Sequence, residues 1–488
     1  MLLTSCVQTQ LPLFYELMKP PRESCRSSCF LPLQGDGDSG AKSKVRAKKP
    51  NAKFNEEISS DSEAESPVVP RKRQPVEDID YAETPQEKKL RLAKLYLEQL
   101  KEADDNKAED DDFETDLVAG RLEEDVLEQK GKLQRLIAKD LIQPDASEIR
   151  VLRGHKLPIT CLVISPDDKC IFSAAKDCSI IKWDVESGKK LHTIPGGRKG
   201  TEDRHVGHTA HILCMDISSD GKYLATGDMN KLIMIWEGET CKHLYKFTGH
   251  KGPVSGLSFR KGTHDLYSAS HDRSIKVWNV DENAYVETLF GHQDAITGLD
   301  SLSRERCVTA GGRDRTVRVW KIAEESQLVF HGHESSIDCI QLINEEHMIT
   351  GADDGSVSLW SVNKKKPLST VKQAHGCHGD AALEQPHWVA SVAALQNSDT
   401  VASGSHNSHV QLWKCGQYYR RLERLFSVPV SGFVNSLKFS SSGQFLVAGV
   451  GQEHRLGRWW RLKEAKNGIY IIPLKRKPPN PEENKMAE

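Results

Sequence analysis

Histidines accompanied by serine or threonine and by aspartate are the residues of this chain best suited to chemistry. One such set is His155, Ser173 and Asp177, and similar sets follow His250 and His333. A single Ser-His-Asp set could serve nucleophilic catalysis, because the imidazole activates the hydroxyl group. Here the sets recur along the chain, whereas a catalytic triad is singular and is accompanied by an oxyanion hole. Their repetition therefore favours a structural role.

Other catalytic patterns are missing from the sequence. It contains no G-x-S-x-G, no H-E-x-x-H and no G-x-x-x-x-G-K, and the loop at Pro195 to Gly197 is too short to cradle a phosphate. No C-x-x-C pair occurs, and Cys25 and Cys29 lack partners at zinc spacing. We therefore predict a protein that is not an enzyme and that needs neither cofactor nor metal. Its 12 cysteines are interpreted as reduced thiols of an intracellular protein.

One glycine-rich segment, residues 448–460, combines the side chains that RNA contacts commonly use. It carries Gln452, His454, Arg455, Arg458 and a double tryptophan. Glycines allow close backbone approach, and cations can pair with phosphates. The alternative is an atypical repeat whose arginines form salt bridges with their neighbours. A second basic stretch, residues 311–318, contains Arg313 and Arg315, which could instead be solvated strand-edge residues.

Regularly spaced tryptophans reveal the elements that must position these residues. Successive tryptophans are 40 to 53 residues apart, at Trp183, Trp236, Trp278, Trp320, Trp360, Trp413 and Trp459. A period of this length is typical of propeller blades. The two longest spacings contain inserts with the composition of surface loops, at residues 196–204 and 376–385.

Each repeat follows the same order of strand and turn signals. A Gly-His pair opens five of the repeats, as at His155, His208, His250, His292 and His333. Three short apolar strands then follow, and the third ends at the tryptophan. With a fourth strand before the next Gly-His pair, each repeat forms one four-stranded blade. We predict an all-β, seven-bladed β-propeller with a disordered, partly helical N-terminal extension.

These repeats resemble the WD-repeat family over about residues 148–473. The resemblance implies a hydrogen-bond relay of His, Ser or Thr, Asp and Trp, which satisfies buried polar groups. The relay is complete at His155, Ser173, Asp177 and Trp183; at His250, Ser268, Asp272 and Trp278; and at His333, Thr350, Asp354 and Trp360. Other blades depart from it, with Asn230, Ala310 and Asn407 at relay positions. Residues 149–152 and 469–472 are both candidates for the strand that completes the last blade.

The resemblance also places one residue of each blade on the upper rim, directly before the blade aspartate. These positions are Lys176, Met229, His271, Arg313, Asp353, His406 and Gln452. We expect RNA or partner contacts at Lys176, His271, Arg313, Arg315, His406, Gln452, His454, Arg455 and Arg458.

The residues before the repeats are divided by composition. Residues 1–82 are predicted to be a disordered tail, and basic residues in it resemble nuclear localisation signals: Lys42, Lys44, Arg46, Lys48, Lys49, Arg71, Lys72 and Arg73. Between them, Ser59, Ser60 and Ser62 precede acids and suit phosphorylation by an acid-directed kinase. Residues 83–143 are predicted to be helical, from a capping box at Thr84 and apolar spacing at 114–141. They pack either on the propeller or on a partner. The propeller is assigned to residues 144–473, and residues 474–488 to a second disordered tail.

Three segments together resemble a narrower family, the WD-repeat subunits of the U-three small nucleolar ribonucleoprotein. They are residues 56–62, 87–97 and 449–460. The resemblance implies a nucleolar protein that binds the box B/C region of U-three snoRNA with the small kink-turn-binding protein. It also implies association with the box C/D core proteins and the small-subunit processome, a role in precursor ribosomal RNA processing, and a monomer within that particle.

A generic WD-repeat adaptor, such as a ubiquitin-ligase substrate receptor, is the alternative. The one Trp-Asp pair, at Trp183 and Asp184, lacks the following arginine typical of such receptors. The formal net charge of −2 favours neither function, and no apolar run reaches the roughly 20 residues of a membrane-spanning helix.

Overall fold

The structure is a computed structural model. It describes residues 133–198, 200, 205–379 and 384–477, together with Gly120, Leu122, Glu124, Val126 and Leu127, which are helical. The basic clusters, the acidic serine patch and the capping box at Thr84 lie outside the described residues. No helix among the residues described has the length and apolar character needed to cross a membrane.

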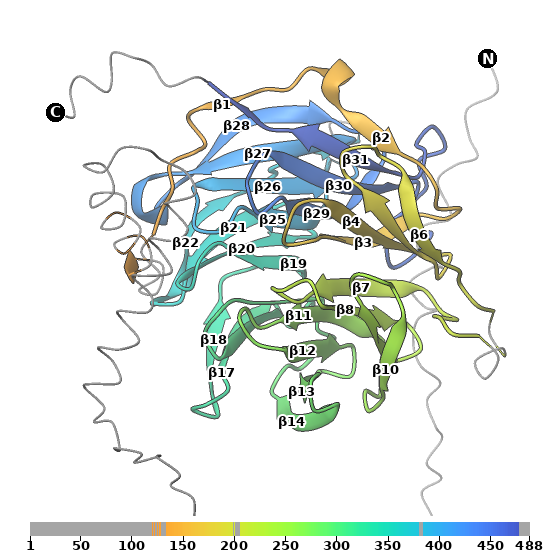
Figure 1. Ribbon diagram of the computed structural model, residues 1–488. Coiled ribbons are helices and arrows are strands. Elements are labelled where there is room, and N and C mark those ends of the chain that lie inside the picture. Colours follow the sequence, from red (N-terminus) through yellow and green to blue (C-terminus); the bar gives the residue numbers. More distant parts are fainter. Residues whose placement is uncertain are drawn as a thin grey trace, which may run out of the picture. The chain divides into compact units, whose positions relative to one another are not determined.

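Seven four-stranded antiparallel sheets form the described body, and they are arranged around a central channel (Figure 1). In each blade the first strand given below lines this channel. Blade 1 contains β3 (Ile159–Ile164), β4 (Cys170–Ala175), β5 (Ile180–Asp184) and β6 (Lys190–Ile194). Blade 2 contains β7 (Ile212–Ile217), β8 (Tyr223–Asp228), β9 (Ile233–Glu237) and β10 (His243–Phe247). Blade 3 contains β11 (Val254–Phe259), β12 (Asp265–Ser270), β13 (Ser274–Asn279) and β14 (Ala284–Phe290). Blade 4 contains β15 (Gly298–Ser301), β16 (Arg306–Ala310), β17 (Thr316–Lys321) and β18 (Ser326–His331). Blade 5 contains β19 (Ile337–Leu342), β20 (His347–Ala352), β21 (Val357–Ser361) and β22 (Lys364–Val371). Blade 6 contains β25 (Val389–Ala394), β26 (Thr400–Ser405), β27 (His409–Cys415) and β28 (Leu422–Pro429).

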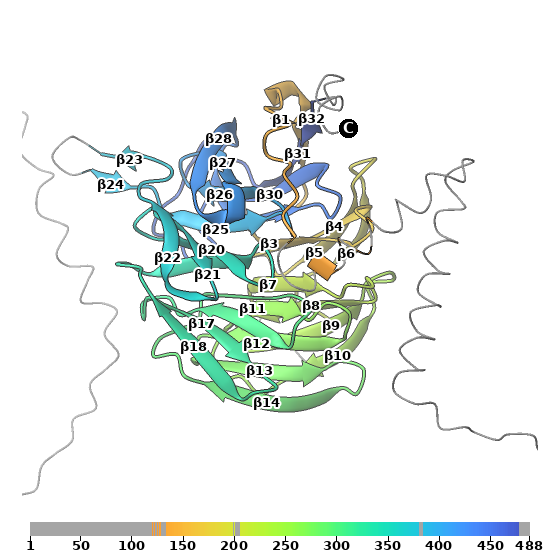
Figure 2. The same ribbon diagram turned by 90° about the vertical axis from the view of Figure 1, so that its left-hand side faces the viewer.

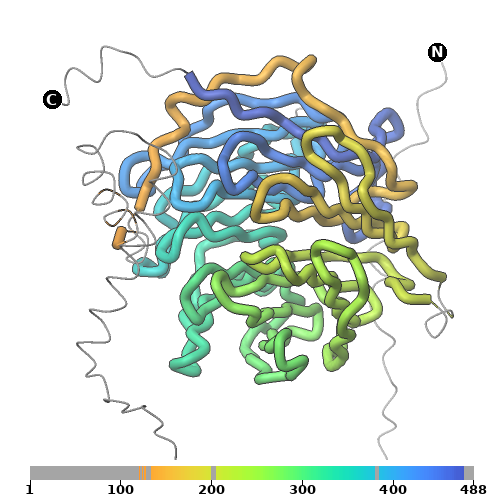
Figure 3. Tube along the Cα trace, in the orientation of Figure 1, coloured from red at the N-terminus to blue at the C-terminus, as the bar shows by residue number. Residues whose placement is uncertain are grey.

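The seventh blade joins the two ends of the repeat region. It contains β29 (Phe433–Phe439), β30 (Phe445–Gly451), β31 (Gly468–Pro473) and, as its outermost strand, β2 (Arg150–Leu152). Val151 of β2 pairs with Tyr470 of β31. Figure 3 shows the two segments side by side. Both candidate strands of the sequence therefore belong to the last blade, and the predicted seven-bladed propeller is confirmed.

The burial of the strands decreases from the channel outward, and their side chains follow this change. Every residue of β3 is buried, whereas four of the five residues of β6 are exposed. The apolar core lies between neighbouring blades, where Val163 of blade 1 packs with Leu224 and Trp236 of blade 2. Successive side chains of a strand point to opposite faces of its sheet, so each sheet buries both faces against the neighbouring sheets.

The residues just before the propeller form an extended strap, residues 133–142, in place of the predicted end of a helix. The backbone N–H groups of Ile137 and Ala138 donate to Asp399 Oδ1 of blade 6, at 2.8 and 2.9 Å. β1 (Leu141–Ile142) then pairs with β32 (Lys475–Arg476). The spacing of Leu133, Ile137 and Leu141 imitates a helix, but blade 6 supplies the backbone partners that a helix would supply internally. The propeller's pairing with the strap extends beyond the predicted boundary at 473, to β32.

Three short elements complete the described residues. η1 (Ala146–Glu148) links the strap to β2, and η2 (Gln417–Tyr419) joins β27 to β28. The insert before blade 6 forms a small hairpin of β23 (Cys377–His378) and β24 (Gln385–Pro386), which projects from the body of the propeller (Figure 2).

Candidate nucleic-acid interface

Six of the seven blades carry a buried chain of histidine, hydroxyl group and tryptophan. In each, the indole N–H donates to the Ser or Thr oxygen at 2.8 Å. The same oxygen lies 2.6–2.8 Å from the histidine Nε2. The sets are His155–Ser173–Trp183, His208–Thr226–Trp236, His250–Ser268–Trp278, His292–Thr309–Trp320, His333–Thr350–Trp360 and His375–Ser403–Trp413. These histidines therefore stabilise blades, because each holds polar groups that burial would otherwise leave unpaired.

Two of these sets differ from the sequence analysis. In blade 2 the acid is Asp228, whose carboxylate lies 2.9 Å from His208 Nδ1, and Asn230 is not its substitute. In blade 4 the hydroxyl belongs to Thr309, one residue before Ala310. The relay residues stand one or two positions earlier than the repeat spacing indicated, within β16 and at the end of β8, and their contacts with His292 and His208 identify them.

The acidic member of the relay varies among the other blades. His155 lies 3.4 Å from Asp177, and His250 lies 3.1 Å from Asp272. Asn407 replaces the acid in blade 6, where its oxygen lies 3.3 Å from His375 Nδ1. Asp354 in blade 5 accepts the backbone N–H of Ser356 at 2.8 Å.

Lys176 and Arg458, two of the predicted contact residues, form ion pairs with one carboxylate. Lys176 is buried, lies 3.5 Å from Glu453 and donates to the Gly457 carbonyl at 3.2 Å. Burial lowers the pKa of Lys176. Arg458 also pairs with Glu453, at 3.1 Å, while 71% of its side chain remains exposed. Lys176 therefore connects blade 1 to the loop between β30 and β31 of the last blade, and Arg458 of the same loop remains accessible to a ligand.

Arg455 extends into the central channel. Its Nη2 donates to the carbonyls of Thr297 and Asp338, at 3.3 and 2.9 Å. It lines the channel together with innermost-strand residues of all seven blades. Burial raises the pKa of Asp338 to about 7, and the charge of Arg455 opposes that increase. Arg455 therefore fixes the loop over the channel and is poorly placed to bind a phosphate from solvent.

A depression of about 710 Å³ gathers four of the predicted residues on one face. His271, Arg313, Arg315 and His454 line it, together with Trp459, which is 59% exposed. Arg313 and Arg315 are both exposed, and Arg315 Nη1 donates to the Glu334 carbonyl at 3.4 Å. Exposed guanidinium groups beside an exposed indole can pair with phosphates and stack on a base.

Acidic side chains make the depression mixed in charge. Asp294, Glu334, Asp338 and Asp353 also line it. A duplex lying along a uniformly positive groove is therefore a poor match. A single-stranded segment, held at a few phosphates and by stacking, fits this lining better.

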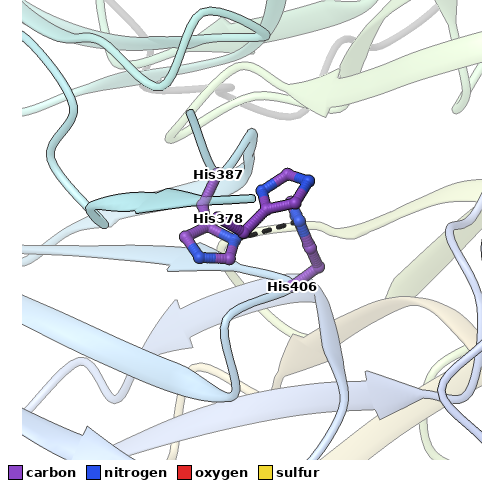
Figure 4. A group of neighbouring side chains, drawn as sticks. All are labelled: His378, His387 and His406. Carbon is purple, nitrogen blue, oxygen red and sulfur yellow. Dashed lines mark hydrogen bonds between the residues drawn. The ribbon is translucent and has the colours of Figure 1, made fainter. Parts of the chain in front are cut away.

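The remaining two predicted residues lie outside this depression. Gln452 is half-buried, and its Nε2 donates to the Ala465 carbonyl at 2.7 Å. His406 is buried beside two histidines of the insert, His378 and His387 (Figure 4). The sequence analysis did not identify Trp388, which follows the insert and lines the depression. It lies outside the repeat pattern, so its position carried no signal.

The histidine cluster is the one group of potential metal ligands found among the described residues. One ligand atom from each of His378, His387 and His406 lies within 4.8 Å of the others. His387 Nδ1 and His406 Nε2 are 3.0 Å apart. Burial, with the two neighbouring imidazoles, lowers the pKa of His406 to about 4.

Comparison with known proteins reveals both the repeat family and close relatives. The family model described as WD domain, G-beta repeat matches residues 146–184, 201–237, 241–279, 283–321, 324–361 and 382–414. These matches correspond to the six blades with a relay. The chain is 66% identical over 433 residues to the U3 small nucleolar RNA-interacting protein 2 of Mus musculus, covering 89% of this chain and 91% of the relative.

A human relative and a solved structure agree with this match. The human U3 small nucleolar RNA-interacting protein 2 is 69% identical over 399 residues, covering 82% of this chain and 84% of the relative. A solved structure of U3-55K is 69% identical and superimposes with a TM-score of 0.66. That comparison covers 68% of this chain and 100% of the solved chain.

Proposed function

Since the chain belongs to the family of WD-repeat proteins that includes the U3 small nucleolar RNA-interacting protein 2 of mouse and human, we propose that it is a non-catalytic subunit of the U3 small nucleolar ribonucleoprotein. Identity of 66% extends over 89% of the chain. A shared binding role is therefore favoured over a generic adaptor that happens to share the fold.

The finer role concerns one RNA element and its protein partners. The protein binds the box B/C region of the U3 snoRNA together with the small kink-turn-binding protein, next to the box C/D core proteins. Base pairing by the snoRNA then selects the precursor ribosomal RNA. The subunit supports early processing towards the small ribosomal subunit within the small-subunit processome, in the nucleolus.

The depression on the propeller face is the observation that carries an RNA-binding role. Arg313 and Arg315 contribute two exposed guanidinium groups, and Trp459 contributes an exposed ring, within one lining. Arg458 adds a cation from the same loop as Trp459. Arg455 is left out of this surface, because its guanidinium is bonded to carbonyls in the channel.

Reversing the charges of this depression tests the role. We expect R313E/R315E to abolish U3 snoRNA recovery in crosslinking followed by RNA sequencing. Two lost phosphate contacts should also reduce the slope of log affinity against log salt by about 1.4 to 1.8. The matched control is K364E/K365E, which reverses two exposed lysines of β22. Unchanged snoRNA recovery by R313E/R315E, with the fold verified by circular dichroism, would exclude this site.

Nuclear entry is proposed to depend on the basic clusters of the N-terminal tail. Removing residues 1–82 takes away Lys42 to Lys49 and Arg71 to Arg73 while keeping every described strand. Fluorescence imaging should then show the truncated protein in the cytoplasm. Continued nucleolar accumulation of the truncated protein would contradict this proposal.

A further inference from the structure

Three histidines that play no part in the blade relays lie together beside blade 6. His378 belongs to β23 of the insert hairpin, His387 follows β24, and His406 follows β26. Their ring centroids are 4.6 to 5.4 Å apart. Figure 4 shows the three side chains converging, with the contact between His387 and His406 dashed.

The ring nitrogens of this cluster are incompletely paired. His378 Nδ1 and His406 Nδ1 are buried and have no hydrogen-bond partner among the described residues. Buried polar atoms usually have a partner, so two such atoms in one cluster indicate a missing ion or water. The relay histidine His375 contrasts with them, because Ser403 and Asn407 occupy its two nitrogens.

Aromatic rings enclose the cluster and limit its exposure to water. Trp460 lies 5.1 Å from His378 and 5.4 Å from His406, measured between ring centroids. Phe433 stacks on His406 at 5.5 Å, and Trp388 lies 5.2 Å from the same ring. Such an apolar wall excludes competing water and orients the imidazoles, as the surroundings of metal sites commonly do.

We propose that His378, His387 and His406 bind a divalent transition-metal ion, Zn²⁺ in the cell, through one imidazole nitrogen each. Imidazole ligands suit zinc, copper and nickel, whereas magnesium and calcium require oxygen ligands. Zinc–nitrogen bonds of about 2.0–2.1 Å at tetrahedral angles place ligand nitrogens roughly 3.3 Å apart. One nitrogen of each ring lies within 4.8 Å of a nitrogen of each of the other two rings. Small ring rotations therefore complete the site.

The ion would connect the insert to the propeller. His378 and His387 flank the hairpin, and His406 belongs to the turn after β26, so one ion fixes both. Trp388, next to His387, also lines the depression that contains Arg313. Three histidines leave a fourth position for water or a ligand. This proposal does not rest on the RNA-binding role, because none of the three histidines lines the depression.

Metal binding by the full chain, produced without a histidine tag, tests the proposal directly. Equilibrium dialysis against ZnCl₂, with metal analysis by mass spectrometry, should give one Zn²⁺ per chain. Substitution by Co²⁺ should produce the visible bands of a tetrahedral site without a thiolate charge-transfer band, because no cysteine is among the ligands.

Variants assign the site to these side chains. H378A and H387A each should lose the bound ion and the Co²⁺ bands, and Zn²⁺ should raise the melting temperature of the unchanged chain but not of either variant. H331A, at an exposed histidine of β18, and C377S, beside His378, should retain both signals. Because His406 is buried, H378A and H387A, in the partly exposed insert, decide the result without risk to the blades.

Three results would overturn the proposal. The unchanged chain could bind no Zn²⁺, the H378A/H387A double variant could keep one ion per chain, or the Co²⁺ complex could show a thiolate band. The last result would place the metal on cysteines and not on this cluster.

Discussion

At the scale of single residues, the relay hydroxyls and acids determine which side chains are available for binding. His208 and Asp228 are both fully buried, and their contact of 2.9 Å completes the relay of blade 2. Asp228 also accepts the backbone N–H of Leu232 through its other oxygen, at 3.0 Å. By contrast, Asn230 is exposed and donates to Thr209. The polar residue that the repeat spacing indicated therefore takes no part in the relay.

Substitution of Asp228 and of Asn230 tests which of the two residues belongs to the relay of blade 2. We expect D228A to lower the free energy of unfolding by about 2–3 kcal/mol, because the buried His208 and the partly buried Leu232 amide lose a charged acceptor. N230A should change it by less than about 0.5 kcal/mol, as is usual for an exposed residue. Urea unfolding of both variants measures the difference. A larger loss in N230A than in D228A would refute the assignment of Asp228.

At the scale of elements, the strap at residues 133–142 shows how the propeller uses chain outside its repeats. Leu133 and Leu141 are buried, and the backbone of Arg135 forms an isolated parallel β-bridge with Ser398 of blade 6. Asp399 supplies the charged acceptor for two strap amides. The strap therefore packs on the propeller, which is one of the two placements that the sequence left open for residues 83–143.

Removing the acceptor should release the strap without opening the blades. We expect D399A to lower the opening free energy of residues 133–142 by about 2–3 kcal/mol, because two hydrogen bonds to a charged group are lost. Hydrogen exchange followed by mass spectrometry measures this change segment by segment. The control is E124A, which removes an ion pair to Arg135 whose side chains are half exposed, at 52% and 54%, and should have little effect. Equal protection of the strap in D399A and the unchanged chain would contradict the expectation.

At the scale of the whole molecule, ring closure depends on strand β2. It pairs three residues of the N-terminal side of the chain with β31, and Leu152 packs against Trp183 and Ile469. Without this strand, β31 would have an unpaired edge, which is a template for aggregation. A propeller needs every blade to bury its neighbours, so one missing outer strand affects the whole ring.

Two truncations measure the contribution of closure. A chain that begins at residue 144 keeps β2, whereas a chain that begins at residue 154 loses it. The shorter chain should melt several degrees lower and aggregate faster, because the buried area of Leu152 and the β2–β31 hydrogen bonds are lost. Differential scanning calorimetry and light scattering provide the comparison. Equal melting temperatures would show that β2 is not required for closure.

The candidate site was predictable where residues follow the repeat and unpredictable where tertiary contacts decide their state. Residue types and positions indicated Arg313 and Arg315 as binding residues, and the structure places both at the surface of one depression. The same argument selected Lys176 and Arg455, which the structure ties to Glu453 and to backbone carbonyls. Exposure depends on which distant segment covers a side chain, and no local pattern contains that information.

The sequence by itself determined the number of blades and their order, because buried strands and relay tryptophans recur at intervals of 40 to 53 residues. Tertiary structure alone decided the closure by β2, the path of the strap and the gathering of three histidines from an insert and a turn. Each of these depends on contacts between residues far apart in the chain. The period of the sequence reflects how the strands of one blade are buried. The contacts of β2, the strap and the histidines form only when the completed ring brings separate segments together.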